Sequence, residues 1–446
     1  MARPHDAARS FSRRTLLRVG PLSLLGLAAR GAAAGPKPAG GTGKALILLF
    51  MTGGPAQQET FDPKPNAPSG TGGEFKPIST SVPGTLVCEH LPLLAKQAHR
   101  YAIVRSTWHG SDTHGVGVHL NLTGLKHTPR QGGEPQVDRR DPPCIGSVVR
   151  QLRGDRNGLP GAIQLPRQVG DQNNAYWGGQ HAGFLGPKWD PLFLHDEAWL
   201  PGDSLPGLAP AADVTADRQT ARAGLLDALQ AGRGASDNDF ARFQRQALDM
   251  LRSSAAWKAF RLDDEKPGTI DRYGDNRFGR SCLVARRLVE AGVGCVTVPW
   301  TFKQSEQNFD THSKHFPKMK DKLLPVIDRA MAALLDDLHD RGLIDDTLVA
   351  WTGEFGRTPK INGGGGRDHW GRVYSTVLAG AGIKGGAVVG KSTNDGGQPA
   401  DDAVHTTDFF ATMYHALGHT SADAVTDPAG RPHHFMQGRP VTKLFG

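Results

Sequence analysis

The chain has 446 residues and a formal net charge of +8. Its first 34 residues hold six Arg and one Asp, a net of +5, so the remainder of the chain carries only about +3. This weak balance, with no Lys/Arg stripe interleaved with aromatic residues, argues against a nucleic-acid-binding protein.

The N-terminus has the features of an export signal. Arg13-Arg14 is followed by an apolar run at residues 19–29 and by small residues at Ala32-Ala33-Ala34. This order is typical of a cleaved secretory leader, and the paired arginines direct it to the twin-arginine translocase. The run is too short for a stable membrane span, although an uncleaved anchor or a frayed tail are alternatives. We expect a leader over residues 1–34, a flexible linker over 35–44 and a periplasmic mature protein.

The predicted elements alternate between strands and helices. Short apolar runs bounded by turn residues predict buried strands at 45–51, 101–105, 294–300, 347–352 and 375–379. Helical patterns lie at 91–99, 221–229, 239–251, 318–339 and 407–417. The alternation predicts an α/β fold, a three-layer sandwich with a mostly parallel central sheet, in a single domain over 45–446. Such a sheet places its sites at the carboxyl ends of its strands.

The region from about 125 to 215 is different in composition. It is rich in Pro, Gly and Trp and has little periodicity. We expect an irregular insert over the sheet rather than disorder, because its aromatic residues would be costly to expose.

The four cysteines give no strong signal. Cys88, Cys144, Cys282 and Cys295 form no CxxC pair, which argues against a zinc ribbon or a disulfide scaffold. One disulfide is compatible with an oxidising compartment, but the sequence does not assign its pairing.

A polar segment directly follows the predicted strand at 101–105. It carries Ser111, Thr113 and His114, with further histidines at His109 and His119. Hydroxyl and imidazole groups crowded into so short a segment favour an activated nucleophile or a metal site. The alternative is a polar loop whose histidines cap backbone groups.

Acidic residues follow two other predicted strands. Asp310 and His312 come after 294–300, and their carboxylate and imidazole groups are usual ligands of zinc, manganese or iron. Glu354 and Arg357 come after 347–352. Glu354 suits metal ligation or base chemistry, and Arg357 suits bidentate binding of a phosphate or sulfate. The alternatives are an Asp cap beside a solvated His, and a surface ion pair.

A glycine quartet at residues 363–366 predicts a mobile loop, which Arg367-Asp368-His369-Trp370 ends. His369 suits metal ligation with Asp368 behind it as an orienting partner, although adjacent side chains more often point apart. Because each cluster follows a strand, a doubly wound sheet would bring them all to one edge.

Three runs resemble a known family. They are Phe61-Asp62-Pro63-Lys64-Pro65, Gly353-Glu354-Phe355-Gly356-Arg357-Thr358-Pro359 and Gly366-Arg367-Asp368-His369-Trp370. From about residue 45 to the C-terminus the chain resembles the bacterial exported family called domain of unknown function 1501, which is similar to alkaline phosphatases and sulfatases. The resemblance implies an alkaline-phosphatase-like fold and one or two divalent ions of zinc, manganese or calcium. It implies a metal set of Asp310, His312, Glu354 and His369, with Asp368 beside it.

The chain departs from that superfamily pattern in two places. Counting back from Thr123-Gly124 puts His114 where a nucleophilic Cys, Ser or Thr is expected, and no Cys-x-Pro-x-Arg or Ser-x-Pro-x-Arg run occurs. This argues against a formylglycine sulfatase. The first strand runs into Thr52-Gly53-Gly54-Pro55 instead of a metal-binding Asp, and the nearest acids are Glu59 and Asp62. One of two metal sites is therefore weakened, moved or lost.

Two functions from different classes follow. The first is an exported metal-dependent hydrolase of phosphate or sulfate esters, in which Arg357 holds the anion and His114, Thr113 or Ser111 attacks or orients water. The second is a non-catalytic envelope protein on a degenerate hydrolase fold that binds a glycan or a partner protein. The expected ligand is a small anionic ester or a glycan. A dinucleotide enzyme is disfavoured, because Gly53-Gly54-Pro55 is not the G-x-G-x-x-G fingerprint.

Overall fold

The computed structural model describes residues 44–127, 137–170, 176–195, 239–300 and 308–446, together with isolated helical positions between 217 and 228. The expected leader at 1–34 and all but the last residue of the linker at 35–44 lie outside these ranges. The expected helix at 221–229 is described only at some of its positions, which are helical.

A nine-stranded sheet organises the described residues. Its spatial order is β12 (Val388–Val389), β4 (Tyr101–Trp108), β11 (Tyr374–Ala379), β8 (Thr347–Thr352), β1 (Ala45–Phe50), β7 (Cys295–Pro299), β5 (Ala162–Gln164) and β6 (Leu192–Phe193), with β15 (Val404–His405) paired to β4. β11 runs antiparallel to β4 and β8, whereas the other pairings in this sheet are parallel. The predicted α/β class with a mostly parallel sheet is confirmed.

The central strand β1 shows why the sheet is covered on both faces. All six of its residues are apolar and buried. Ile47 and Leu49 face one hydrophobic core, whereas Leu46, Leu48 and Phe50 face a second core on the opposite side. A parallel strand buried on both faces reads as a continuous apolar run, which is the pattern that predicted it.

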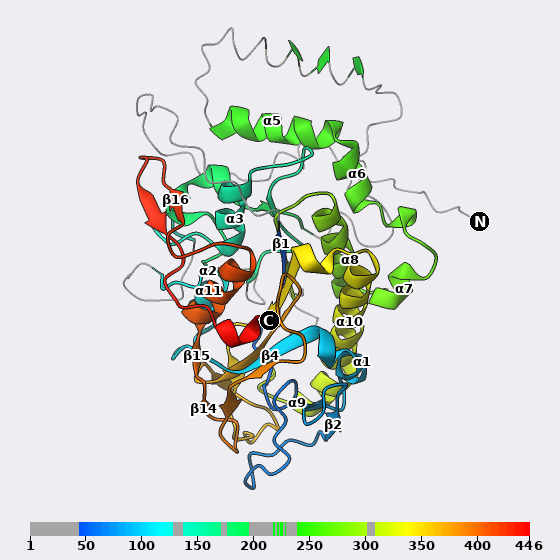
Figure 1. The fold of residues 1–446 in the computed structure, drawn as a ribbon, viewed down its shortest axis with the longest axis vertical. Helices are drawn as coiled ribbons and strands as arrows, with labels where there is room; N and C mark the ends of the chain where they lie inside the picture. Colours follow the sequence, from blue (N-terminus) through cyan, green and yellow to red (C-terminus); the bar gives the residue numbers. More distant parts are fainter. Residues whose placement is uncertain are drawn as a thin grey trace, which may run out of the picture. The chain divides into compact units, whose positions relative to one another are not determined.

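Helices form a layer on each side of the sheet (Figure 1). The first core packs under α1 (Pro92–Lys96), α8 (Arg277–Glu290) and α10 (Leu324–Asp340), and the second under α2 (His114–Thr123), α3 (Ile145–Arg153) and α11 (Thr406–Ala416). Further α-helices in the described ranges are α5 (Asp239–Arg252), α6 (Ser254–Phe260), α7 (Thr269–Tyr273) and α9 (His315–Lys318). A π-helical segment, Met319–Leu323, joins α9 to α10, so the helix expected at 318–339 begins earlier than predicted.

The region expected to be an irregular insert is partly regular. It supplies α3 to one helical layer and the strands β5 and β6 to one edge of the sheet. Four small two-stranded sheets complete the described part: β2 (Pro77–Ser79) with β3 (Leu86–Cys88), β9 (Gly356–Arg357) with β10 (His369–Trp370), β13 (Lys391–Ser392) with β14 (Pro399–Asp401), and β16 (Ala424–Thr426) with β17 (Pro432–His434). All four cysteines are buried free thiols.

A search of the described helices for a membrane span finds none with the necessary length and apolar character.

Candidate metal centre

Polar residues gather where four strands of the sheet end. Gly53 follows β1, His114 follows β4 at the first position of α2, Asp310 follows β7 and Glu354 follows β8. These strands are parallel to one another, so their carboxyl ends share one edge of the sheet. His369 joins them because β10 pairs with β9, which follows β8 directly.

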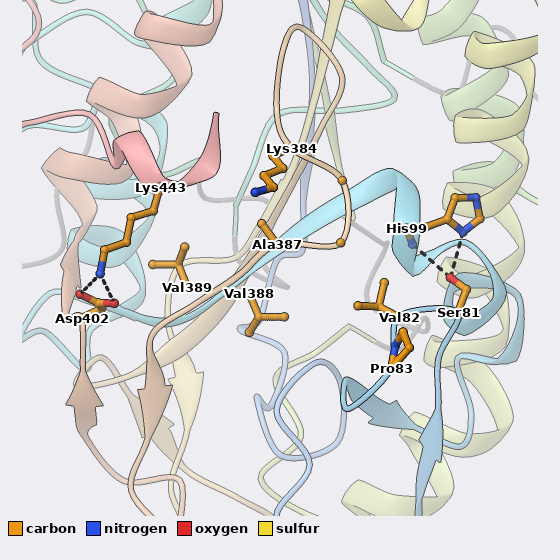
Figure 2. Close-up of a pocket in the computed structure, with 12 residues that line it drawn as sticks. Ser81, Val82, Pro83, His99, Lys384, Ala387, Val388, Val389, Asp402 and Lys443 are labelled. Carbon is orange, nitrogen blue, oxygen red and sulfur yellow. Dashed lines mark hydrogen bonds and ion pairs between the residues drawn. The ribbon is translucent and has the colours of Figure 1, made fainter. Parts of the chain in front are cut away.

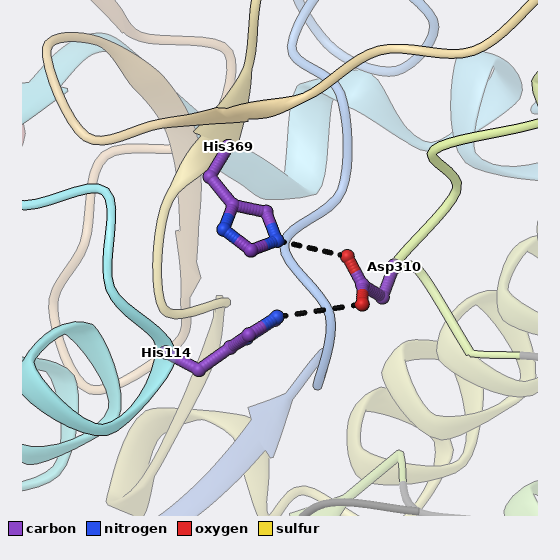
Figure 3. A group of neighbouring side chains, drawn as sticks. All are labelled: His114, Asp310 and His369. Atoms are coloured by element: carbon purple, nitrogen blue, oxygen red, sulfur yellow. Dashed lines mark hydrogen bonds and ion pairs between the residues drawn. The ribbon is translucent and has the colours of Figure 1, made fainter. Parts of the chain in front are cut away.

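The carboxylate of Asp310 is the centre of the cluster. Its Oδ1 lies 3.0 Å from His369 Nε2 and 3.0 Å from His312 Nε2, and the two imidazole nitrogens are 2.9 Å apart. Its Oδ2 lies 3.4 Å from His114 Nε2. Figure 3 shows His114 and His369 approaching the carboxylate from the same side, each toward a different oxygen. Three imidazole Nε2 atoms therefore converge on one carboxylate.

Each of these imidazoles is held from behind through Nδ1. The acceptors are two carboxylates and one carbonyl, none of which can donate, so in every ring Nδ1 carries the proton. The pairs are His114 Nδ1 with Glu354 Oε1 (2.8 Å), His312 Nδ1 with Asp368 Oδ1 (2.7 Å), and His369 Nδ1 with the Asp112 carbonyl (2.9 Å).

This arrangement fits a bound cation. A neutral imidazole with its proton on Nδ1 presents a lone pair at Nε2, and here those lone pairs face carboxylate oxygens and one another. Such contacts are repulsive unless a proton or a metal ion lies between them. Nδ1 donation to a carboxylate or carbonyl is also the usual support of a metal-ligating histidine. His114, Asp310 and His369 have ligand atoms that all lie within 4.8 Å of one another, which makes them a potential metal-ligand triad.

The electrostatics of the cluster reflect the same crowding. Burial alone would raise the pKa of Asp310, but hydrogen bonds from His114 and His369 and the charge of Arg357 hold it far below its usual range. Burial opposes protonation of His114, yet the Asp310 and Glu354 carboxylates raise the pKa of its imidazole to about 9. A proton on His114 is therefore stabilised beside Asp310, on the side where a cation would also balance the carboxylate.

Glu354 supports the cluster from the end of β8. It is fully buried, and its Oε1 accepts hydrogen bonds from the Gly53 backbone N–H (2.7 Å) and from His114 Nδ1 (2.8 Å). Its Oε2 has no hydrogen-bond partner among the described residues. Glu354 thus orients His114 and reaches Asp310 only through that ring.

Asp368 orients a different histidine from the one that its sequence position indicates. Its Oδ1 accepts from His312 Nδ1, and this hydrogen bond lowers the pKa of the Asp368 carboxyl. His369, its neighbour in the sequence, points the other way and donates to Asp112. The expectation that Asp368 stands behind His369 is therefore corrected. Asp368 directly precedes β10, and successive residues of an extended chain point to opposite sides.

Arg357 does not lie where it could bind an anion. It is fully buried, and its guanidinium donates to the carbonyls of Gly53, Gly54 and Arg367 and to Asp310 Oδ1, the last at 2.7 Å. All three guanidinium nitrogens are therefore used within the protein. The structure assigns Arg357 to holding Asp310 against the loop after β1, which differs from the anion-binding role expected for it.

The hydroxyl candidates precede His114 in the chain, and within the described residues neither Ser111 nor Thr113 bonds to the cluster through its side chain. Ser111 Oγ accepts from the Thr113 backbone N–H at 3.3 Å, and Thr113 is exposed at the N-cap of α2. His114 follows as the first helical residue and makes the contacts described above. Of the three residues expected near the attacking position, His114 is the one that the structure places in the cluster.

Two aromatic residues pack against the imidazoles, one of them from the insert whose aromatic residues were expected to be buried. Trp177 stacks flat on His114, with ring centroids 5.1 Å apart and planes 6° apart. Phe355 is fully buried and stacks on His369, with centroids 4.6 Å apart. These contacts restrict rotation of both imidazoles. The Gly-Glu-Phe-Gly-Arg motif contained Phe355, but its spacing gave no indication of the stacking.

The glycine quartet is fastened to the cluster. Asn362 Oδ1 accepts from the backbone N–H groups of Gly364 (2.9 Å) and Gly366 (3.0 Å). The N–H groups of Lys314 and His315 donate to the carbonyls of Gly364 and Gly365. The expected mobile loop is instead bound along the segment that carries Asp310 and His312.

The pocket in Figure 2 lies apart from this cluster. Its lining includes Val388 and Val389 of β12, a His99–Ser81 hydrogen bond of 2.9 Å and a Lys443–Asp402 ion pair of 2.7 Å. No residue of the metal cluster lines it. The chemistry of the cluster and this hollow are therefore separate features.

Residues 43–445 match the family model described as Protein of unknown function (DUF1501). The chain belongs to this family. The resemblance in the motifs around Phe61, Glu354 and His369 is thereby confirmed. No curated protein matches the chain.

Several solved structures are similar to this member at low identity. One is a protein in the alkaline phosphatase superfamily from Vibrio parahaemolyticus, with 12% identity over 92% of this chain and 72% of that chain and a TM-score of 0.40. A phosphonate monoester hydrolase from Silicibacter pomeroyi has 13% identity over 90% and 76%, with a TM-score of 0.38. A sulfatase from Pseudoalteromonas sp. has 13% identity over 90% and 72%, with a TM-score of 0.39. These values are too low to transfer residues or activities.

Proposed function

We propose that this chain is an exported, metal-dependent hydrolase of phosphate or sulfate esters. The observation that carries the proposal is the convergence of three Nδ1-anchored imidazoles on the Asp310 carboxylate. Asp310, His312 and His369 would hold the ion, because the Nε2 atoms of both imidazoles lie 3.0 Å from Asp310 Oδ1. His114 also forms a potential triad with Asp310 and His369, but its Nε2 lies at Oδ2, at 3.4 Å, so we assign it proton handling instead. When bound, a divalent cation supplies a Lewis acid that polarises an oxygen of the ester.

The protein's own groups supply position and proton handling. His114 lies at the second oxygen of Asp310, and Glu354 and Trp177 fix the orientation of its ring. Its Nε2 is thus placed to hold or move a proton next to the reacting atoms. Trp177 and Phe355 lie against the ring faces of His114 and His369 and would shield them from water.

The donor set narrows the choice of metal. Two imidazoles and a carboxylate are ligands that suit zinc or manganese, whereas calcium takes six to eight oxygen ligands. Of the three ions that the family resemblance implies, we therefore propose zinc or manganese.

Removal and return of metal test this function. We expect the full chain, stripped with a chelator, to be inactive on a panel of aryl phosphates and sulfates, and to recover turnover with about one equivalent of Zn²⁺ or Mn²⁺. Metal content and initial rates are measured on the same samples, with Ca²⁺ as the control ion. A chain that binds neither ion and turns over no ester contradicts the proposal.

A non-catalytic binding role is the second candidate. It is favoured by the absence, among the described residues, of a bond from Ser111 or Thr113 to the cluster, and by the burial of Arg357. The same assay separates the two functions. A chain that binds one ion tightly but turns over no ester would be a binding protein, with a small anionic ester or a glycan as the ligand to test.

Export is proposed from Arg13-Arg14 and the apolar run that follows. A twin-arginine signal is read by a receptor as an address, so replacing both residues with Lys keeps the charge but removes the address. We expect the Arg13→Lys, Arg14→Lys double variant to remain in the cytoplasm, whereas an Arg18→Lys control is exported. The distribution of a tagged chain between periplasmic and cytoplasmic fractions measures this, and equal export of both variants would exclude the twin-arginine route.

A further inference from the structure

A second set of polar residues lies buried against the metal cluster. Glu59, from the loop after β1, is 1% exposed, and Arg367, His315 and Thr311 are each 0% exposed. Buried charges are costly unless they are paired and hydrogen-bonded, so a network of this kind needs a reason.

The four side chains form one continuous chain of bonds. Glu59 Oε1 accepts from Arg367 Nη2 at 2.8 Å, and Glu59 Oε2 lies 3.1 Å from His315 Nε2. Because the Glu59 carboxylate can only accept, the His315 proton is on Nε2. His315 Nδ1 then accepts from the Thr311 hydroxyl at 2.6 Å.

Both ends of this chain adjoin the expected metal ligands. Thr311 lies between Asp310 and His312, and Arg367 lies immediately before Asp368 and His369. The two ends also meet directly, since the Arg367 backbone N–H donates to the Thr311 carbonyl at 3.3 Å. A single carboxylate from the loop after β1 therefore ties together the two segments that must keep a fixed spacing to hold an ion.

We propose that Glu59 is a positioning residue that sets the affinity of the metal centre by fixing the Asp310–His312 segment relative to the Asp368–His369 segment. The loop after β1 supplies no ligand of its own to the cluster, and it acts through Glu59 instead. Loss of such outer support commonly weakens metal binding by about 10- to 100-fold. This inference rests on the proposed cation site.

Glu59→Gln is the first test variant. Glutamine keeps the shape of the side chain, but its amide places an N–H group against Arg367 or His315, both of which donate. Thr311→Val is the second and gentler variant, because it keeps the branched shape and removes only the hydroxyl that His315 Nδ1 needs.

Asp328→Asn is the matched control. Asp328 is an acid of α10 with 3% exposure, and it accepts from the backbone N–H groups of Leu93 (2.9 Å) and Leu94 (2.8 Å) at the start of α1. Its replacement also breaks buried hydrogen bonds, but those bonds join two helices and touch neither ligand segment. A loss of general stability would therefore appear in the control as well.

The measurement is the dissociation constant of Zn²⁺ and of Mn²⁺ for the chelator-stripped full chain, by equilibrium dialysis, with urea unfolding in parallel. We expect both test variants to bind about 10- to 100-fold more weakly than the wild type and Asp328→Asn to bind as the wild type does. If Glu59→Gln does not fold, Thr311→Val decides.

The outcomes separate this inference from the proposed function. If the test variants bind the ions as tightly as the wild type, the proposed role of Glu59 is wrong but the metal site is not. The same conclusion follows if Asp328→Asn loses as much metal affinity as the test variants do. A wild-type chain that binds neither ion overturns the metal site itself, and the role of Glu59 with it.

Discussion

Replacing Asp310 with Asn is expected to abolish cation binding and to lower kcat/KM on the best ester substrate by about 1,000-fold. A bound ion contributes several kcal/mol of transition-state stabilisation, and each 1.36 kcal/mol corresponds to a factor of ten in rate. The side chain of Asp310 is the one group on which all three imidazoles converge. Without its charge, the remaining imidazoles have no anionic ligand to complete the site.

The Asn variant is chosen because it should still fold. Its amide oxygen, in the place of Oδ1, can still accept from Arg357, which donates to Asp310 Oδ1 at 2.7 Å. Its amide N–H groups then take the place of Oδ2, where they can donate to a lone pair on His114 Nε2 without an ion. We therefore expect the unfolding midpoint to change little while metal content and activity fall together.

Asp402→Asn is the control for this variant. Asp402 has a backbone φ of 42°, which Asn tolerates, and its carboxylate pairs with Lys443 at the surface. Such an exposed pair contributes little to stability. An Asp310→Asn protein that keeps both its ion and its activity would show that the cluster is not the metal centre.

The parts of the fold that the sequence predicted are those with a regular apolar pattern. β1 and β8 are continuous buried runs and were predicted within one residue of their observed bounds. The apolar face of α10 predicted where that helix ends to within one residue, but not where it begins. α8 was not predicted, because Arg286 lies fully buried on its inner face, paired with Glu265 at 2.6 Å. A buried arginine interrupts the apolar stripe that marks an amphipathic helix, and only the folded chain shows its partner.

α2 was missed for another reason. Its sequence contains Gly115 and Gly117, which are poor helix formers. The structure shows why glycine is needed: a Cβ at Gly117 would lie 2.5 Å from the carbonyl oxygen of Glu354. The close approach of α2 to Glu354, which brings His114 to the cluster, thus requires glycine. The same glycines lower the helix propensity of the segment, so the sequence did not predict α2.

The candidate site divides in the same way. The sequence predicted its acids and histidines because they follow strands whose carboxyl ends meet at one edge of the sheet. The sequence could not predict that Asp368 bonds to His312. Nor could it predict that the Arg357 guanidinium donates all its observed hydrogen bonds to three carbonyls and Asp310. Those contacts depend on side-chain direction and on loop paths, which spacing along the chain does not determine.

Gly53→Ala is expected to lower kcat/KM by about 100-fold, because a displacement of about 1 Å at a reacting group can have that effect. Gly53 has a φ of 105°, and a Cβ there would lie 2.2 Å from the Asp310 backbone nitrogen and 2.6 Å from the Phe309 carbonyl carbon. Both are backbone atoms, so the clash can be relieved only by moving the segment that carries Asp310. The Gly53 N–H also donates to Glu354, so a shift would disturb His114 as well.

Gly84→Ala is the control, since Gly84 has a φ of 81° but nothing within 4 Å of its added Cβ. It should show only the backbone strain, roughly 1–3 kcal/mol of unfolding free energy, with kcat/KM unchanged. Equal activity in the two variants would contradict the argument.

The lack of space at Gly53 also explains the missing acid after the first strand. Because the backbone of Phe309 and Asp310 packs directly on Gly53, no side chain fits there, and the loop contributes an N–H to Glu354 in place of a carboxylate ligand.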